Sequence, residues 1–228
     1  MTQAQDDTAL GGTLGALQGR RFHAVLFDND GTLTDSTAAV ERSWRRWATE
    51  HGVPKFSLEH YHGMPAAAII AAVAPEIDPV AGLQRIVELE VADTEGVVAL
   101  PGAAQALSVL GGHAAIVTSA TADLAGVRVA AAGLIQPPVM ITADDITRGK
   151  PDPQPYFLGA QGLGVDPSQC LVVEDAHSGL ASGRAAGCAT LGLATTHDAV
   201  ELTADLVIAD LSQIKFGIDE QGIRLSRR

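Results

Sequence analysis

Two carboxylates that follow a short apolar run are the residues of this chain best suited to chemistry. The apolar residues 25–27 end in Asp28, and Asp30 comes two positions later, ahead of Gly31. Side chains two apart in an extended segment point the same way, so both carboxylates would face one site. Such neighbours repel unless a cation or a shared proton relieves them, which indicates a metal site or acid–base chemistry. The alternative is an Asp-rich turn that caps a strand.

Three later segments also place polar groups directly after apolar runs. Thr118-Ser119 offers hydroxyls at a helix start, which suits an anion but also an ordinary helix cap. Lys150 lies in a proline-rich loop that would hold its cation in one place. Glu174-Asp175 ends another apolar run, and an acid pair there is hard to explain by stability alone. In a parallel sheet these groups would meet at the carboxyl edge, where ligands bind.

The rest of the chain predicts such a sheet. Short apolar runs predict strands at residues 22–27, 114–118, 139–142, 170–173, 190–194 and 206–209. Segments of helical length lie between the later runs, at residues 101–110, 123–132, 155–163 and 178–187. This alternation predicts an α/β fold with a Rossmann-like parallel sheet and right-handed crossovers. Alternating apolar and polar residues around a glycine turn predict a β-hairpin over residues 213–225.

One long gap interrupts the alternation and contains helical patterns but no clear strand. Helices are expected near residues 37–51, 66–73 and 83–91, with Trp44 and Trp47 at helical spacing as core of the insertion. We therefore expect a core domain formed by residues 1–35 and 101–228, with a helical cap domain at 36–100. A cap inserted after the first strand would sit over the carboxyl edge of the sheet and exclude water during chemistry.

The composition indicates which kind of partner the protein binds and where in the cell it is expected. The chain has 228 residues and a net charge of -12, which argues against binding to nucleic acid. Cys170 and Cys188 are too few for a disulfide framework and are expected to be reduced. No apolar stretch is long enough to cross a membrane, and the N-terminus lacks the pattern of a signal peptide. We expect a cytoplasmic monomer that acts on a small molecule.

The four polar segments together resemble the four motifs of the haloacid dehalogenase superfamily in order and spacing. These segments are residues 28–36, Thr118-Ser119, residues 149–151 and Glu174-Asp175. The resemblance implies that Asp28 attacks phosphorus and that Asp30 acts as general acid and then base. It further implies a Mg²⁺ ion held by Asp28, the main-chain carbonyl of Asp30 and Asp175, with Glu174 behind these ligands. Phosphate would be bound by Ser119, Lys150 and backbone N–H groups near Asn29 and Ala120.

Within the superfamily, the chain is similar to capped sugar- and polyol-phosphate phosphatases, including the hexitol-phosphate, 2-deoxyglucose-6-phosphate and glycerol-phosphate enzymes. His62 and Gly63 are then candidates for contacts with substrate hydroxyls in the cap. Relatives often carry a basic residue after this pair, whereas this chain has Met64-Pro65, which leaves the exact substrate open. The alternatives are a phosphomutase resembling β-phosphoglucomutase, a metal-independent dehalogenase and a module that binds phosphorylated ligands without catalysis.

Overall fold

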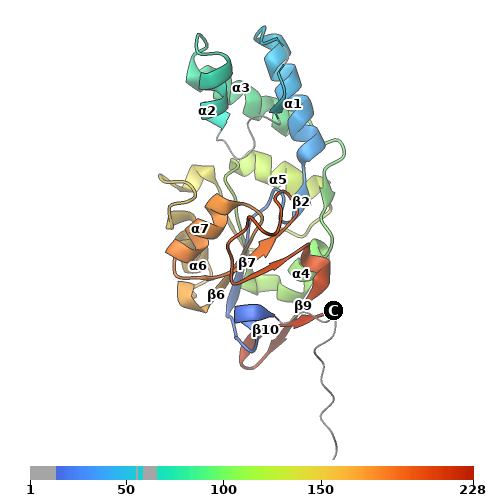
Figure 1. Ribbon diagram of the computed structural model, residues 1–228, viewed down its shortest axis with the longest axis vertical. Helices are drawn as coiled ribbons and strands as arrows, with labels where there is room; N and C mark the ends of the chain where they lie inside the picture. The colour runs from blue at the N-terminus through green and yellow to red at the C-terminus, as the bar shows by residue number, and fades with distance from the viewer. Residues whose placement is uncertain (1–13, 55, 59–65) are drawn as a thin grey trace, which may run out of the picture.

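A computed structural model describes residues 14–54, 56–58 and 66–228. A parallel sheet of six strands forms its centre, and Figure 1 shows helices packed around it. The strand order is β5-β4-β1-β6-β7-β8. The strands are β1 (Ala24–Phe27), β4 (Ala114–Val117), β5 (Val139–Ile141), β6 (Cys170–Glu174), β7 (Ala189–Leu193) and β8 (Leu206–Ile208). Strand β1 lies between β4 and β6, with Phe27 opposite both Ile116 and Val173. The first strand of the chain is therefore central, and its carboxyl end lies beside those of two later strands.

Both faces of the sheet are covered, which explains why its strands are continuous apolar runs. In β1, Ala24 and Leu26 pack on one face while Val25 and Phe27 pack on the other, and all four are fully buried. The first face carries α6 (Gln154–Gly162) and α7 (His177–Ala185). The second face carries α4 (Ala103–Leu110), α5 (Ala122–Ala131) and the antiparallel hairpin of β9 (Ile214–Asp219) and β10 (Gly222–Arg227).

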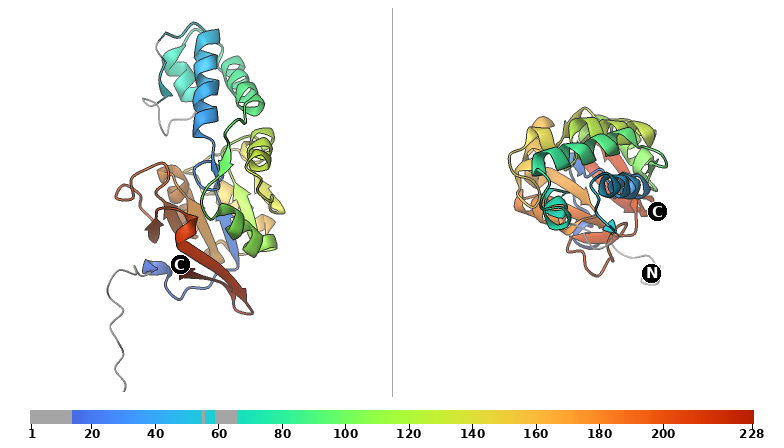
Figure 2. Two further views of the ribbon diagram at one scale, coloured as in Figure 1. Left: turned by 90° about the vertical axis from the view of Figure 1, so that its right-hand side faces the viewer. Right: turned by 90° about the horizontal axis from the view of Figure 1, so that it is seen from above.

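Three helices in the described part of the chain lie between β2 (Thr34–Asp35) and β3 (Val98–Ala99) and stand over one end of the sheet (Figure 2). They are α1 (Thr37–Glu50), α2 (Ala66–Val73) and α3 (Pro79–Ala92). Their apolar sides form a separate core around Trp44, Trp47 and Ile70, all at most 3% exposed. The indole N–H of Trp47 donates to the carbonyl of Gly82 over 2.9 Å, which ties α1 to α3. These helices thus form a body with its own core, connected to the sheet by two chain crossings.

The expected α/β fold and C-terminal hairpin are confirmed, with two local corrections. The insertion contains a short strand, β3 (Val98–Ala99), which pairs antiparallel with β2 (Thr34–Asp35) where the chain enters and leaves the three helices. Two residues are too short a run to predict from sequence. Phe22 was expected in the first strand, but it forms an isolated bridge with Ile223 of the hairpin instead. Strand β1 consequently begins at Ala24.

Other expectations from composition also have structural counterparts. Cys170 and Cys188 are free thiols in buried positions, so neither takes part in a disulfide. No helix within the described residues is both long enough and apolar enough to span a bilayer.

Candidate active site

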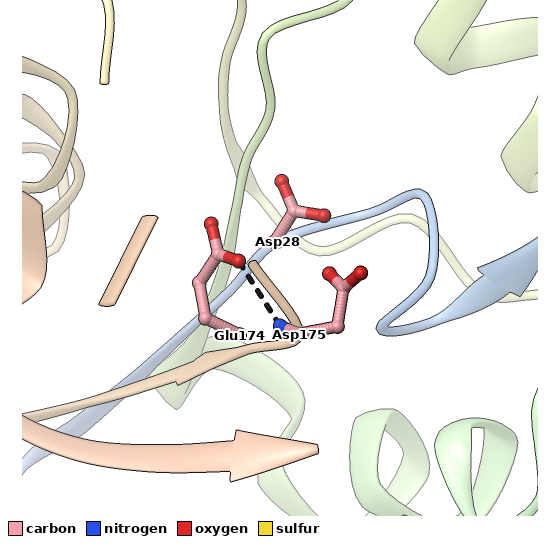
Figure 3. A group of neighbouring side chains, drawn as sticks. All are labelled: Asp28, Glu174 and Asp175. Carbon is pink, nitrogen blue, oxygen red and sulfur yellow. Dashed lines mark hydrogen bonds between the residues drawn. The ribbon is translucent and has the colours of Figure 1, made fainter. Parts of the chain in front are cut away.

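Three carboxylates from the ends of two neighbouring strands converge at the carboxyl edge of the sheet (Figure 3). Asp28 follows β1, while Glu174 and Asp175 stand at the end of β6, and the two strands are paired in parallel register. One oxygen from each carboxylate lies within 4.8 Å of the others. All three residues are buried, with exposed fractions of 8%, 1% and 4%. The topology therefore concentrates negative charge where the sequence predicted chemistry.

Lys150 is the cation that partly neutralises this cluster. Its Nζ donates to Asp28 Oδ1 over 2.6 Å, to Glu174 Oε1 over 2.7 Å and to the carbonyl of Val117 over 2.9 Å. One lysine does not balance three carboxylates. Burial raises the pKa of Asp28 well above its usual value, Lys150 lowers it, and Glu174 and Asp175 raise it further. The residual negative charge suits a hard divalent cation, which prefers oxygen ligands.

Both carboxylate oxygens of Glu174 accept hydrogen bonds from protein groups. Oε1 accepts from Lys150 and, over 2.9 Å, from the hydroxyl of Tyr156. Oε2 accepts the backbone N–H groups of Asp175 and Ala176, each over 3.0 Å. Four donors on one carboxylate favour a role in placing Lys150 and Asp175. The predicted role of Glu174 behind metal ligands stays a prediction.

Asp175 is fixed by hydroxyl groups on its other side. The hydroxyl of Thr32 donates to Oδ1 over 3.1 Å, and the hydroxyl of Thr196 donates to Oδ2. Burial and the neighbouring Glu174 raise the pKa of Asp175 to about 6 against the lowering effect of these hydroxyls. Gly31 approaches the same carboxylate with φ of +85°, and a Cβ there would lie 2.7 Å from Asp175 Cγ. Only glycine combines this left-handed conformation with such a close approach.

Asp30 sits at the entrance to this cluster, where Ser36 and Arg128 bind its carboxylate. Its Oδ1 accepts the hydroxyl of Ser36 over 2.7 Å. Its Oδ2 pairs with Arg128 of α5 over 3.0 Å, and the second terminal nitrogen of Arg128 lies 3.6 Å from Glu90 of α3. The side chains of Arg128 and Glu90 are only 7% and 13% exposed. The carboxyl group of Asp30 is therefore linked through Arg128 to the helical insertion.

A cavity of about 430 Å³ opens above the carboxylates, between the sheet and the insertion. Ser119 and Ala120, the residues predicted to bind phosphate, line this cavity. The backbone N–H of Ala120 donates to the hydroxyl of Thr118 over 3.1 Å, so an anion would have to share or replace that bond. Asn29 is fully buried, and its carbonyl closes the turn by accepting the backbone N–H of Leu33 over 2.8 Å.

The remaining expectations have different outcomes. His62 and Gly63 lie outside the described residues. Trp44 and Trp47 are core residues of the insertion, as their spacing predicted. His177, which the sequence left without a role, begins α7 and packs edge-on against the ring of His197, with centroids 4.9 Å apart.

Sequence reasoning missed four residues that contact the site, namely Glu90, Arg128, Tyr156 and Thr196. Glu90, Arg128 and Tyr156 lie on helices and Thr196 lies in the loop after β7, all outside the four polar segments. These parts of the chain approach the strand ends only after folding. One signal was available for Arg128, a cation in an otherwise largely apolar helical segment, and one for Glu90, a carboxylate at helical spacing from apolar residues.

Comparison with known proteins shows which chains this one is similar to. Residues 22–187 match the family described as haloacid dehalogenase-like hydrolase. The chain is 45% identical to hexitol phosphatase A from Escherichia coli K12, over 85% of this chain and 94% of that relative. It is 34% identical to glycerol-1-phosphate phosphohydrolase 2 from Saccharomyces cerevisiae, over 86% of each chain. A hydrolase from Pseudomonas syringae superposes with a TM-score of 0.72 at 26% identity, covering 83% and 94% of the two chains.

Proposed function

The chain belongs to the haloacid dehalogenase-like hydrolases, and on that premise we propose that it hydrolyses the monophosphate ester of a small sugar or polyol. The observation that carries this proposal is the buried cluster in which Lys150 bridges Asp28 and Glu174, beside Asp175 and below the cavity. Relatives named for hexitol and glycerol phosphates support the substrate class.

Asp28 is the proposed nucleophile. A carboxylate attacks phosphorus without first losing a proton, so it needs no partner base. Lys150 occupies Oδ1, which leaves Oδ2 to form the new bond to phosphorus while the bond to the leaving alcohol breaks. The product of this step is an aspartyl-phosphate and an alkoxide that must gain a proton.

Asp30 is the proposed proton carrier, because it stands at the cavity two residues from the nucleophile. In the first step its carboxyl group gives a proton to the leaving oxygen. In the second step its carboxylate takes a proton from the water that attacks phosphorus, and this attack releases phosphate and restores Asp28. Ser36 and Arg128 hold the Asp30 carboxyl in place through the two steps.

The phosphoryl group needs compensation for the charge on its non-bridging oxygens. We assign this task to Ser119, to Lys150 and to the backbone N–H groups of Asn29 and Ala120. Lys150 is well suited because its side chain is 6% exposed and three acceptors hold its ammonium group, so its positive charge stays fixed beside the phosphoryl group. All three N–H groups are engaged, so a hydrogen bond to phosphate would replace one of these three bonds. Ser119 is exposed to the cavity and free to turn toward the anion.

The residues present also fit a divalent cation. Three buried carboxylates face one lysine, and burial raises the pKa of both Asp28 and Asp175. We propose that Mg²⁺ is held by Asp28, Asp175 and the main-chain carbonyl of Asp30, with Glu174 supporting them. The ion would supply positive charge to the phosphoryl oxygens.

We further propose that residues 36–100 act as a cap over this site, with residues 1–35 and 101–228 as the catalytic core. Helix α3 already provides one wall of the cavity, and the β2–β3 pair marks both crossings between the two parts. Closure by such a body would keep water away from the aspartyl-phosphate until the alcohol has left.

The test is release of inorganic phosphate from a panel of hexose, hexitol, pentose, glycerol and nucleotide monophosphates. We expect Asp28→Asn to abolish release while the circular dichroism spectrum and melting temperature stay close to wild type. Asp123→Asn, an exposed aspartate outside the cavity, serves as the matched control and should keep full activity. A chelator should stop release, and added Mg²⁺ should restore it.

Two outcomes would contradict the proposal. An active Asp28→Asn variant would show that another group attacks phosphorus. Conversion of a sugar phosphate to an isomer without free phosphate would show a phosphomutase.

A further inference from the structure

Part of the cavity wall is formed by α3 and α5 and contains none of the residues proposed to bind phosphate. On α3, Leu83, Val87 and Glu90 line the cavity at the spacing of one helix face. On α5, Leu124 and Arg128 face them one turn apart. The leaving alcohol would project here, since Asp30, its proposed proton donor, contacts Arg128. We call this part the leaving-group compartment.

The carboxylate of Glu90 compensates the positive charge of Arg128 in the leaving-group compartment. Arg128 lies 3.0 Å from Asp30 Oδ2 and 3.6 Å from Glu90 Oε1, with its side chain 7% exposed. When Asp30 carries its proton, Glu90 is the only described anion paired with Arg128. Without Glu90, the guanidinium would present an unbalanced positive charge to the leaving group. Apolar walls would strengthen its attraction for any anion there.

We propose that Glu90 is the residue that restricts this enzyme to uncharged leaving groups. Its carboxylate accepts a hydrogen bond from a substrate hydroxyl, cancels the charge of Arg128 and repels a carboxylate or second phosphate on the substrate. This inference rests on the proposed phosphatase function and adds to it the basis for choosing neutral sugar and polyol phosphates.

A purely structural role of Glu90, tying α3 to α5, makes a different prediction. Loss of a tie between the insertion and the core would lower turnover of all substrates by the same factor. Loss of a charge filter changes the ratio between neutral and anionic substrates of equal size. The ratio of two kcat/KM values therefore separates the two roles.

Glycerol 3-phosphate and 3-phosphoglycerate form a suitable pair, because they share the ester and the neighbouring hydroxyl and differ by a carboxylate in place of a hydroxymethyl group. Glucitol 6-phosphate and 6-phosphogluconate provide the same contrast on a six-carbon chain. Phosphate release is measured at about pH 8.5, where Glu90 is ionised although burial raises its pKa to about 7.

We expect the wild type to prefer the neutral member of each pair, and Glu90→Gln to reduce this preference by about tenfold or more. Glu88→Gln removes the same charge from the same helix, but Glu88 is half exposed and lies outside the cavity, so the preference should stay unchanged. Arg128→Gln should increase the preference while lowering turnover of both members, because Asp30 loses its partner.

An unchanged ratio in Glu90→Gln, or a wild type that turns over the anionic members equally well, would overturn the inference. Neither result touches the proposed function as long as phosphate is released. Absence of release from every neutral ester would instead refute the phosphatase itself. If Glu90→Gln does not fold, the opposite shift expected of Arg128→Gln still decides the matter.

Discussion

Replacement of two helical glycines by alanine should have opposite effects, and the difference tests how the catalytic cluster is packed. Gly179 lies in α7 against Glu174, and a Cβ there would overlap both Oε1 and Cδ of that side chain. Even the farther oxygen, Oε2, would be 2.5 Å away, where ordinary contacts begin at 3.4 Å. Gly126 lies in α5, and a Cβ there would meet nothing within 4 Å.

The expected magnitudes follow from what each Cβ meets. Alanine is favoured over glycine inside a helix by roughly 1 kcal/mol, so Gly126→Ala should stabilise the fold by about 0.5–1 kcal/mol. Gly179→Ala gains the same stabilisation from the helix preference of alanine. It also forces the Glu174 side chain to move away from Lys150 and Tyr156. Hydrogen bonds to a charged group contribute roughly 1.5–3 kcal/mol each. The net loss in the free energy of unfolding should be about 2–4 kcal/mol.

Thermal unfolding and phosphate release measure both effects. For a chain of this length, Gly179→Ala should lower the melting temperature by roughly 5–15 °C, and Gly126→Ala should raise it by a few degrees. Displacement of Lys150 should also reduce kcat of Gly179→Ala by about tenfold or more. A Gly179→Ala variant as stable and active as wild type would show that Glu174 swings aside at no cost. Equal destabilisation by both variants would indicate a general effect of losing glycine.

Two further predictions concern groups around the site. Tyr156→Phe removes one of four donors to Glu174 and should lower the free energy of unfolding by about 1.5 kcal/mol, measured by urea titration, with no change if the hydroxyl is dispensable. Burial raises the pKa of Glu90 to about 7, so its contribution to stability is greatest below about pH 4 and is lost as the pH rises toward about 7. The free energy of unfolding of Glu90→Gln should therefore rise relative to that of wild type by up to about 3 kcal/mol between about pH 4 and about pH 8. A difference between the two free energies that does not change with pH would contradict this.

The strands, and the polar residues that follow them, were predictable from the sequence. Apolar runs of four to six residues predicted the strands, because a sheet covered on both faces needs side chains that are apolar in both directions. Parallel order then required the residues after those runs to share one edge. For this reason the sequence predicts that Asp28, Lys150, Glu174 and Asp175 lie together. In the structure Lys150 donates hydrogen bonds to Asp28 and Glu174, and a carboxylate oxygen of Asp175 lies within 4.8 Å of oxygens of those two acids.

Helix packing lies beyond such reasoning. Whether Arg128 faces solvent or a cavity depends on the rotation of α5 against the sheet, and Glu90 meets it only because α3 packs over α5. A periodic pattern specifies which face of a helix is apolar but not which neighbour that face will contact. The strand β3 was not predicted because it has only two residues and its pairing partner, β2, lies more than sixty residues away in the sequence.

The sequence by itself determined the order of strands and helices, the carboxylates and lysine at the strand ends, and the family to which they point. These features depend on local patterns and on the geometry that every parallel sheet shares. Only the tertiary structure decided how the charges are paired: which donors hold Glu174, how Asp175 is fixed, and how Arg128 joins Asp30 to Glu90. Those contacts depend on distances of a few ångströms between elements that are remote in the chain, and packing alone sets such distances.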